Sequence, residues 1–512
     1  MAVDTSAVTG TGDGAGEGKP TLKRGAIGLA GVVFMVVAFS APITAMTGNL
    51  PVAVGFGNGL GAPAGFLIAT IVLTIFSVGF VALARHITAA GAFYTFVSRG
   101  WSKIPGLAAG VMSMVTYMTM EAALIGIFSA FTDQAMTSQF GIDLPWEVYA
   151  LGCLLVIALL SHFDISVAAK VLGVVLVAEI VILTLIAVAS LIASPDGMSF
   201  TSLNPMTALS TNGVAGGVIG LGLLMAFWSW VGFESTAIYG EESKDPKRIV
   251  PKATFIAVIG IGVFYTFISW GVIVGNGPDK AVELASGADP FQLLYSPAQA
   301  YLGPWAVTIF EWLVLGGSFA CALAIHNSAA RYLFAFGRDR LLWHRLGSAH
   351  PQHASPWVAS LTQSGVAAIL LIVCSVTKSD PYAELFVLVA ILATLCLLTV
   401  QIMSSISTIV YFHVKKQHPE TASWWRTLLA PVVGGLGMLL VIYLMASNME
   451  AAAGTASESL FFKMIPWIVL TLLFGSMAVA LILRKVDPVR YARIGSTVFD
   501  DRPEDVLAAD RA

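Results

Sequence analysis

Five ionisable side chains lie inside long apolar stretches of this 512-residue chain: Glu121, Glu179, Glu234, Glu311 and His326. An ionisable group near the centre of a bilayer costs roughly 2.5–3.5 kcal/mol on insertion scales, so each is a candidate for binding a ligand or exchanging a proton. The sequence contains no phosphate-binding Gly-x-x-x-x-Gly-Lys loop, no cluster with metal-ligand spacing and no nucleophile motif. These residues therefore favour reversible binding over bond-breaking chemistry, and we expect no catalytic residue, no metal and no cofactor.

Pro42 and Gly232 predict breaks in two of the apolar helices. Proline removes a backbone donor and clashes with the preceding helical turn, and a carboxylate and several aromatics surround Gly232. In lipid, such a break is tolerated only where it is buried in protein or lines a cavity. The hydroxyl groups of Ser40, Thr44 and Thr47 could hydrogen-bond the backbone groups that the first break frees. The breaks are therefore expected near residues 40 and 232.

Two broken helices side by side would form a small site with complementary partial charges. Half-helix N-termini present free N–H groups, which suit a carboxylate, and the opposite ends present carbonyls, which suit an ammonium group. A zwitterionic amino acid fits this arrangement. The residues expected to contact it are Ser40, Ala41, Ile43, Thr44, Gly232 and Phe233. Tyr117 could reach the site with its hydroxyl, and Glu234 lies in the second break, where it either handles a proton or accepts hydrogen bonds from free backbone donors.

The composition predicts the elements that hold these residues. The chain is 57% hydrophobic and 11% charged, against about 25% charged residues in soluble proteins, and its mean hydropathy is +0.83. These values exclude an ordinary soluble enzyme, and the net charge of −3 excludes a nucleic-acid binder. Because a membrane helix needs about 20 apolar residues, we expect an all-α polytopic membrane protein with twelve spans. Their approximate limits are 25–53, 62–84, 105–131, 146–161, 167–193, 216–240, 252–275, 303–336, 357–376, 382–411, 427–446 and 465–483.

The distribution of Lys and Arg predicts the orientation. With the N-terminus in the cytoplasm, 24 of the 27 basic residues lie on the inner side, and Lys280, Lys378 and Lys463 lie outside. Both termini are then cytoplasmic, in a cell-membrane protein. Residues 1–24 and 484–512 are expected to be cytoplasmic tails, the first of them disordered. No loop is long enough for a soluble domain, which argues against a kinase, a cyclase or an ATP-driven pump.

The two predicted breaks lie five spans apart, in spans 1 and 6. Because five is an odd number, the second set of helices would have the inverted orientation of the first. Interrupted helices in corresponding positions of two halves indicate the binding site of a transporter. The expected units are residues 25–193 as the first five-helix repeat, 194–411 as the second with its leading loop, and 412–483 as two additional helices.

Three motifs resemble those of the amino acid–polyamine–organocation superfamily of permeases, over about residues 25–483. The first is Gly232-Phe233-Glu234-Ser235 followed by residues 241–253, similar to "G-F-E … E-E-x-x-x-P-x-x-x-x-P-x-A". The second is Ala90-Gly91-Ala92-Phe93-Tyr94, similar to "G-G-x-Y". The third lies at residues 327–339 and is similar to "R-x-x-x-x-x-G-R-D". The resemblance implies a core of ten helices in two inverted repeats, plus two more helices.

The resemblance also implies roles for two side chains and shows one departure. Trp228 resembles the aromatic that covers the substrate in exchanger relatives, and Phe227, Trp230 and Phe233 are the alternatives for this role. Proton-coupled relatives commonly have a lysine on span 5, and Glu179 stands at the similar position here. A carboxyl group shielded from water holds its proton more firmly, so we expect Glu179 to carry the coupling proton. Pro42 stands where many members have glycine, so a substrate carboxylate would use neighbours such as Ile43 or Thr44.

The sequence therefore predicts a secondary active transporter that moves an amino acid by alternating access, with the proton as coupling ion. Glu179 and Glu234 are the residues expected to respond to protons. Proton symport and exchange both stay open, and so does a related amine or polyamine as substrate. A channel or non-transporting receptor is the alternative from another class, but channels tend toward symmetric pores with selectivity rings, which this sequence lacks.

Overall fold

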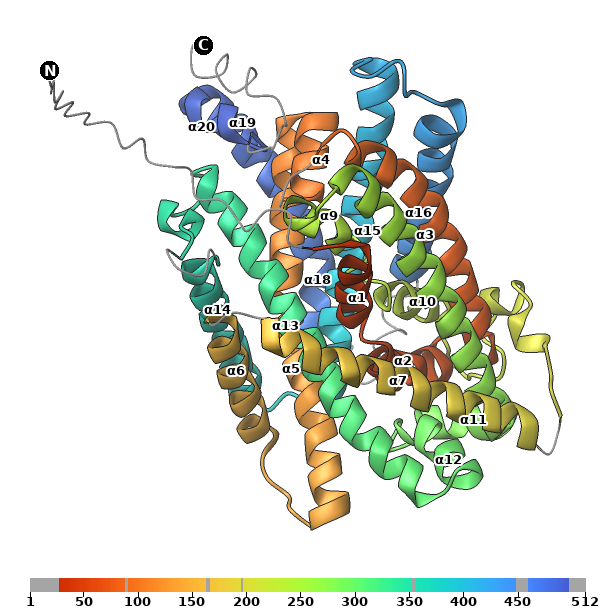
Figure 1. Cartoon of the computed structure of the whole chain (residues 1–512). Coiled ribbons are helices and arrows are strands. Elements are labelled where there is room, and N and C mark those ends of the chain that lie inside the picture. The colour runs from red at the N-terminus through yellow and green to blue at the C-terminus, as the bar shows by residue number, and fades with distance from the viewer. Residues whose placement is uncertain are drawn as a thin grey trace, which may run out of the picture.

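The computed structural model describes residues 27–87, 91–162, 166–194, 197–350, 355–447 and 459–496. The predicted tail at 1–24 and Ala90 of the second motif lie outside these ranges. Within them the chain is helical, apart from turns and one bridge between Ile27 and Ser243. The helices form one bundle (Figure 1).

The elements are named in chain order. The earlier helices are α1 (Leu29–Ser40), α2 (Pro42–Val52), α3 (Ala62–Ala84), α4 (Phe93–Gly100), α5 (Lys103–Phe140), α6 (Trp146–His162), α7 (Ser166–Ala193), α8 (Ile219–Trp228) and α9 (Ser235–Ile238). The later helices are α10 (Pro246–Asn276), α11 (Pro278–Ser286), α12 (Gln292–Tyr301), α13 (Pro304–Arg338), α14 (Trp357–Val376), α15 (Val387–Ile409), α16 (Ala430–Ala446), α18 (Leu460–Leu470), α19 (Ser476–Val486) and α20 (Pro488–Arg493). Short 3-10 or π segments are η1 (Ala53–Gly57), η2 (Gly59–Gly61), η3 (Thr201–Leu203), η4 (Thr207–Leu209), η5 (Tyr239–Glu242), η6 (His344–Gly347), η7 (Pro381–Phe386), η8 (Val410–Val414), η9 (Trp424–Leu429) and η11 (Thr471–Gly475).

Among the described residues, ten helical stretches are long and apolar enough to cross a membrane. They coincide with ten of the twelve predicted spans. The two remaining predicted spans coincide with shorter apolar helices, Trp146–Ser161 and Ile219–Trp228. The second of these is short because the helix ends at the break expected near residue 232. The chain is therefore an all-helical, multi-pass membrane protein.

The bundle has a buried centre and an apolar outer surface. Every residue of α2 is buried, as is α8 from Gly220 onward, whereas Val174, Ile192, Val376 and Val486 are each more than 70% exposed on outer helices. Large exposed apolar areas are rare on soluble proteins, but lipid solvates them. The most extensive helix–helix contacts run between α5 and α13 and between α3 and α10.

We call the end of the bundle that carries α4 and α20 the α4 end, and the opposite end, with α11 and α12, the α12 end (Figure 1). The first part of the expected tail at 484–512 is helical and lies at the α4 end. Residues 497–512 lie outside the described part of the chain. Gly495 N–H lies 2.7 Å from Tyr94 Oη and 3.1 Å from Asp339 Oδ2, and its carbonyl accepts from Arg99 Nε at 3.1 Å. Tyr94 in turn donates to Asp339 at 2.6 Å. These contacts join the C-terminal segment to α4 and to the end of α13.

Candidate functional site

The first predicted break is confirmed, and it lies between α1 and α2. Helix α1 ends at Ser40 and α2 begins at Pro42. Between them Ala41 has φ 39° and ψ 75°, a left-handed backbone that a residue with a Cβ rarely adopts. Proline suits the first position of α2 because no helical hydrogen bond needs its missing N–H there. Ser40 and Thr47 donate to carbonyls one turn earlier in their own helices, those of Val36 and Ile43.

The second predicted break is also confirmed, between α8 and α9. Helix α8 ends at Trp228, α9 begins at Ser235, and Gly232 has φ 110°. A Cβ at position 232 would lie 1.8 Å from Phe39 Cδ1, inside the ring's van der Waals surface. The two breaks therefore pack directly against each other, and glycine at 232 is required by both its backbone angle and this contact.

Glu234 holds the second break together. Its Oε2 accepts from Gly232 N–H at 3.1 Å, and its Oε1 accepts from the Tyr117 hydroxyl at 2.5 Å. Both side chains are fully buried, and Tyr117 also stacks on Tyr332 with ring centroids 5.3 Å apart. Glu234 thus accepts from a backbone donor in the break, which is one of the two roles considered for it.

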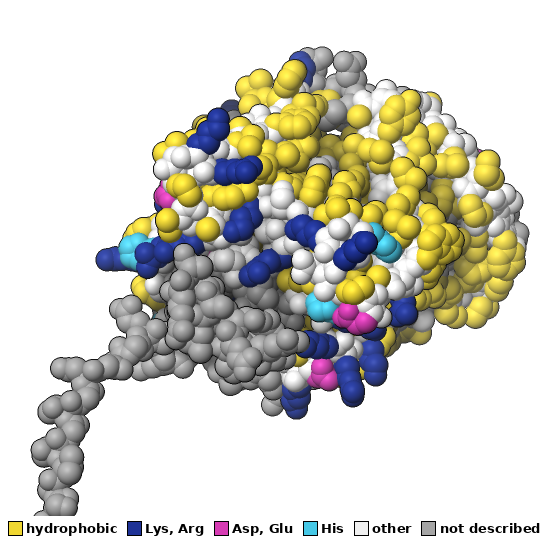
Figure 2. Space-filling model, turned by 90° about the horizontal axis from the view of Figure 1, so that it is seen from above, with side chains coloured by type: hydrophobic (Ala, Val, Ile, Leu, Met, Phe, Trp, Pro, Cys, Tyr) yellow, Lys and Arg dark blue, Asp and Glu magenta, His cyan; other side chains and the backbone are white. Residues whose placement is uncertain are grey.

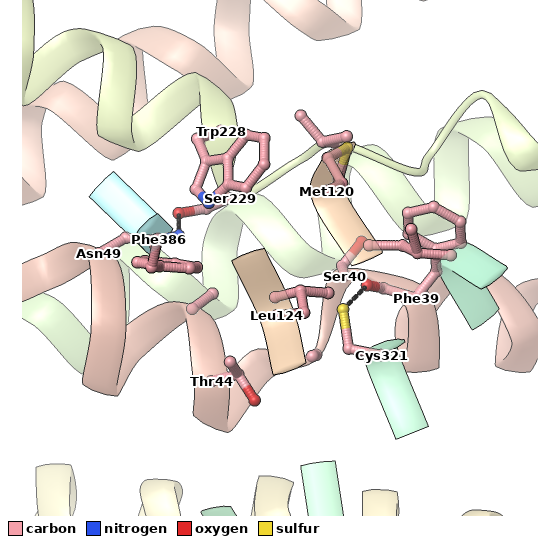
Figure 3. Close-up of a pocket in the computed structure, with 14 residues that line it drawn as sticks. Phe39, Ser40, Thr44, Asn49, Met120, Leu124, Trp228, Ser229, Cys321 and Phe386 are labelled. Carbon is pink, nitrogen blue, oxygen red and sulfur yellow. Dashed lines mark hydrogen bonds between the residues drawn. The ribbon is translucent and has the colours of Figure 1, made fainter. Parts of the chain in front are cut away.

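A small cavity of about 30 Å³ lies between the breaks (Figure 3). Its lining includes four of the residues that were expected to contact a ligand: Ser40, Ala41, Thr44 and Trp228. The other expected contacts are not among its lining residues. Ile43 and Phe233 are fully buried elsewhere, Tyr117 is bonded to Glu234, and Gly232 faces Phe39. Phe233 packs edge-on against Phe76 and Phe80.

Sequence reasoning missed the rest of the lining. These residues are Phe39, Ala45, Asn49, Met120, Leu124, Ser229, Val231, Cys321, Ile325 and Phe386. Two of them carried a signal, since Asn49 is polar within an apolar run and Ser229 follows Trp228 at the break. Asn49 Nδ2 donates to Ser229 Oγ at 2.8 Å, which joins the two broken helices.

The cavity has polar atoms that are available to a ligand. Thr44 Oγ1 and Asn49 Oδ1 are buried and, among the described residues, have no hydrogen-bond partner. Buried polar groups normally have one. At one side the Trp228 ring meets the Phe386 ring edge-on, with centroids 6.2 Å apart. A small, mostly apolar cavity with two unpartnered polar atoms beside an aromatic pair suits a small ligand that carries polar groups.

The carbonyl groups at the end of α1 are covered by side chains. Cys321 Sγ lies 2.9 Å from the Phe39 carbonyl oxygen, and the Tyr265 hydroxyl donates to the Ser40 carbonyl at 2.9 Å. Cys321 is on α13 and Tyr265 is on α10. Orphan carbonyls at a helix end need such partners when water is excluded. An ammonium group that uses these carbonyls must share them with Cys321 and Tyr265.

Glu179 lies behind the first break, at the start of α2. Its carboxylate interacts with the backbone N–H of Ile43, and its Oε2 is buried with no hydrogen-bond partner among the described residues. Gly317 of α13 makes room for it, because a Cβ there would lie 2.6 Å from Glu179 Oε1 and 2.7 Å from Ile43 Cγ2. A side-chain carboxylate thus already lies beside one of the few free donors of the half-helix.

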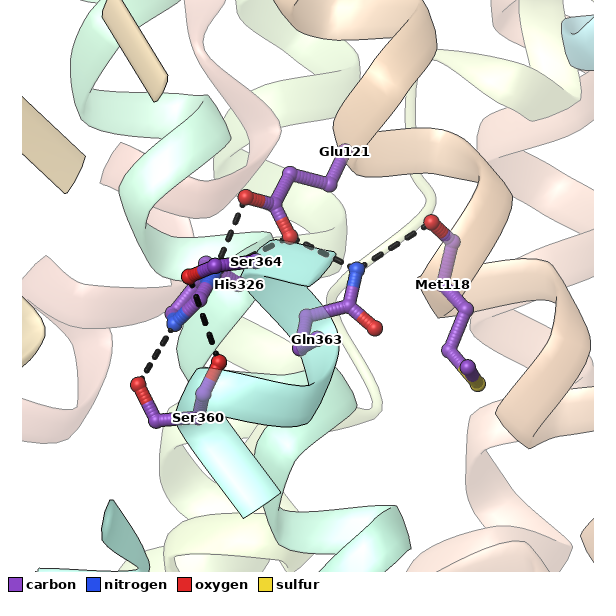
Figure 4. Close-up of polar contacts among 6 residues, drawn as sticks. All are labelled: Met118, Glu121, His326, Ser360, Gln363 and Ser364. Atoms are coloured by element: carbon purple, nitrogen blue, oxygen red, sulfur yellow. Dashed lines mark hydrogen bonds and ion pairs between the residues drawn. The ribbon is translucent and has the colours of Figure 1, made fainter. Parts of the chain in front are cut away.

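A second buried polar cluster links α5, α13 and α14 (Figure 4). His326 Nδ1 lies 2.9 and 3.0 Å from the two carboxylate oxygens of Glu121, and its Nε2 lies 2.8 Å from Ser360 Oγ. Gln363 Nε2 donates to Glu121 at 2.6 Å. Glu121 and His326 are both 0% exposed. Their sequence neighbours Met120 and Ile325 line the cavity, so this cluster lies on the same turns of α5 and α13 as part of the lining.

We expect His326→Leu to lower the free energy of unfolding by about 3 kcal/mol, because it leaves the Glu121 carboxylate buried without its imidazole partner. The measurement is reversible unfolding in mixed micelles. Ser364→Ala is the matched control, since it removes only a 3.3 Å bond to the carbonyl of Ser360 in the same helix, and we expect a change within about 0.5 kcal/mol. Equal stability of the two variants would contradict a structural role for the pair.

Glu311, the last of the five ionisable residues, lies apart from both clusters. It accepts from Gln139 Nε2 at 2.7 Å and from the Ser138 hydroxyl at 3.3 Å. These partners lie on the last turns of α5, toward the α12 end of the bundle. Its carboxylate is therefore hydrogen-bonded within the helix packing, and Glu311 is not among the residues that line the cavity.

The comparisons with known proteins agree with this architecture. The family model described as "Amino acid permease" matches residues 27–474. The branched-chain amino acid permease BcaP of Bacillus subtilis (strain 168) is 23% identical over 403 residues, covering 75% of this chain and 80% of that protein. The low-affinity putrescine importer PlaP of Escherichia coli (strain K12) is 22% identical over 355 residues, covering 68% and 75%.

A third relative is the serine/threonine exchanger SteT of Bacillus subtilis (strain 168), 22% identical over 312 residues, which cover 60% of this chain and 66% of that protein. The family match covers more than four-fifths of the chain and includes both broken helices, the cavity between them and the buried carboxylates. The chain is therefore a transporter and not an enzyme: it belongs to the amino acid permease family, within the amino acid–polyamine–organocation superfamily.

Proposed function

We propose that this permease moves an amino acid across the cytoplasmic membrane by alternating access, with a proton as the coupling ion. In this proposal the chain crosses the membrane twelve times. Residues 25–193 and 194–411 form two inverted five-helix repeats, and residues 412–483 add two helices. The α4 end is cytoplasmic, which accords with the 24 of 27 basic residues assigned to that side. The two breaks lie in corresponding helices of the two repeats, as the proposal requires.

The size of the cavity indicates a closed state of the transport cycle. A cavity needs roughly 10–15 Å³ to hold one water molecule, so the cavity of about 30 Å³ has room for only about two water molecules. An amino acid needs several times that space, so binding requires side chains to move apart. Trp228 and Phe386 are the pair we expect to separate, because they close one side of the cavity through a single ring contact.

One observation carries the proposed coupling: the buried carboxylate of Glu179 lies at the backbone N–H of Ile43 at the break, and its Oε2 has no hydrogen-bond partner among the described residues. Pro42 has no N–H, and Ala45 N–H already donates to the Ala41 carbonyl at 2.9 Å. A substrate carboxylate therefore has few free donors at this helix end and competes with Glu179 for one of them. Protonation of Glu179 weakens the interaction of its carboxyl group with that N–H donor. It also removes the repulsion between the two carboxylates. Proton and substrate binding then favour each other, which is the thermodynamic requirement for symport.

An amine is the second candidate substrate. If the substrate has an ammonium group and no carboxylate, an ionised Glu179 behind Ile43 attracts the substrate, and substrate binding needs no proton. The putrescine importer among the relatives is named for such a substrate. Exchange of one amine or amino acid for another would then need only a site that does not reorient while empty.

Uptake into proteoliposomes tests the proposal. We would offer labelled amino acids and amines, separately pooled, with and without an inward proton gradient. Accumulation of an amino acid that depends on the gradient supports the proposed symport. Uptake of amines, or uptake only into vesicles preloaded with substrate, would favour the second candidate. Protein-free vesicles serve as the control for leakage of the labelled compounds.

A further inference from the structure

A basic pocket opens at the α4 end of the molecule, away from the cavity between the broken helices. Its volume is about 460 Å³, and its lining consists of Arg85, His86, Lys247, Arg248, Pro251, Lys252 and Thr421. These residues come from three separate segments: the end of α3, the first turns of α10 and the loop before η9. Figure 2 shows Lys and Arg side chains gathered on this face, with hydrophobic side chains around its edge.

The pocket concentrates positive charge. Two lysines and two arginines line it, and none of the described residues that line it is acidic. Asp245 lies at the rim, where its Oδ2 is 3.7 Å from Arg248 Nε in an exposed pair, and it also caps the N-terminus of α10. Glu420 lies beyond Thr421 and is bonded to His418 at 2.8 Å. A concave surface with this balance of charge attracts an anion.

The surroundings of His86 show the same excess of positive charge. Its ring stacks on His418 with centroids 4.0 Å apart, and its Nε2 lies 3.1 Å from Thr421 Oγ1. Partial burial lowers the pKa of His86, and the neighbouring His418, Lys247 and Arg85 lower it further, against the opposite effect of Glu420. A bound anion would relieve this repulsion between cations.

The surroundings of the pocket place it at the boundary of the lipid. On α10, Arg248 and Lys252 share a face with Ile256, which is 50% exposed, and with Val263, which is 63% exposed. The basic face of the helix therefore continues directly into a lipid-facing apolar face.

Two exposed tryptophans follow the loop that contributes Thr421 to the pocket. Trp424 and Trp425 begin η9 three residues after Thr421, and they are 69% and 48% exposed. Tryptophan is enriched where a bilayer meets water. An anion in this pocket is thus within reach of the headgroup layer, and a ligand with both a phosphate and acyl chains matches both parts of the surface.

We propose that this basic pocket binds the phosphate of an anionic phospholipid headgroup. The phosphate lies against Arg85, Arg248 and Lys252, and the acyl chains follow the exposed apolar face of α10 past Ile256. Basic pockets between membrane helices bind anionic headgroups in this way. The site is separate from the transport cavity and does not depend on the identity of the transported substrate.

Lipid binding to the purified full-length protein tests the proposal. Native mass spectrometry would compare phosphatidylglycerol with phosphatidylcholine of the same acyl chains. We expect preferential binding of phosphatidylglycerol, and we expect the double variant Arg248→Gln/Lys252→Gln to bind it roughly 30-fold more weakly, since two basic groups near an anionic headgroup contribute about that much. Arg85→Gln is a second variant, taken from another helix, and should weaken binding in the same direction.

The matched control is Arg484→Gln/Lys485→Gln, which removes two exposed charges from the last turn of α19, outside the pocket. We expect its affinity to stay within about twofold of the wild type. Equal losses in the control and the pocket variants would overturn the proposal in favour of general surface charge. A large excess of inorganic phosphate, added as a competitor, distinguishes the two sources of the anion. Full displacement of the lipid by phosphate would mean a site for free anions and would also overturn the proposal.

Discussion

Glu179→Gln is expected to abolish accumulation driven by a proton gradient while leaving exchange intact. A gradient of one pH unit stores about 1.4 kcal/mol per proton, so one-to-one symport sustains at most about tenfold accumulation. In the variant the ratio should fall to about one, because an amide does not titrate. Glutamine retains an oxygen that can accept from Ile43 N–H, so the geometry at the start of α2 should persist. The measurement is the ratio of internal to external substrate in proteoliposomes at fixed pH gradients.

Glu311→Gln is the matched control for this experiment, because it makes the same chemical change at a buried carboxylate that does not line the cavity. It should keep the gradient-driven accumulation. If Glu179→Gln accumulated substrate as the wild type does, Glu179 would not carry the coupling proton. Loss of exchange as well as accumulation would instead indicate that the carboxylate is needed for binding.

Gly232→Ala is expected to have the largest effect on the folded state. The added Cβ would lie 1.8 Å from Phe39 Cδ1 and 2.4 Å from its Cε1, and the backbone at 232 has φ 110°. Overpacking costs about 1–3 kcal/mol, and a sparsely populated backbone conformation costs a further ~1–3 kcal/mol. We expect a large fall in thermal stability, together with transport reduced at least about 100-fold, since the two broken helices can no longer pack against each other.

Two comparisons make this expectation specific. Gly152→Ala in α6 is the control, because a Cβ there meets nothing within 4 Å, and we expect transport and stability close to the wild type. Adding Phe39→Ala to Gly232→Ala removes the ring that clashes, so part of the lost stability should return, although the backbone cost remains. If Gly232→Ala alone were as stable as the wild type, the contact between the two breaks would not be as tight as described.

Local chemistry explains why the breaks were predictable from the sequence. Proline at 42 and glycine at 232 act on their own helices, so their effect does not depend on distant residues. The position of the bend was predicted only approximately, because the residue that takes the left-handed backbone is Ala41. The outer spans were predictable for a similar reason, since lipid selects for continuous apolar runs.

The composition of the cavity was much harder to predict. Met120, Leu124, Ile325 and Phe386 look like any other apolar residues, and only the packing of α5, α13 and η7 brings them together. The pairing of Glu121 with His326 spans 205 residues of sequence. Each residue could be recognised as an ionisable group in an apolar run, but periodicity within one helix contains no information about which helix it meets.

The contacts of Gly495 have a consequence for the timing of the transport cycle. Tyr94 precedes the third predicted span and Asp339 follows the eighth, so the C-terminal segment ties together the two halves of the molecule at the α4 end. Any motion that opens this end by separating α4 from the end of α13 must first break these hydrogen bonds. The segment after α20 therefore stabilises the arrangement in which α4 and the end of α13 lie together, relative to any arrangement in which they are apart.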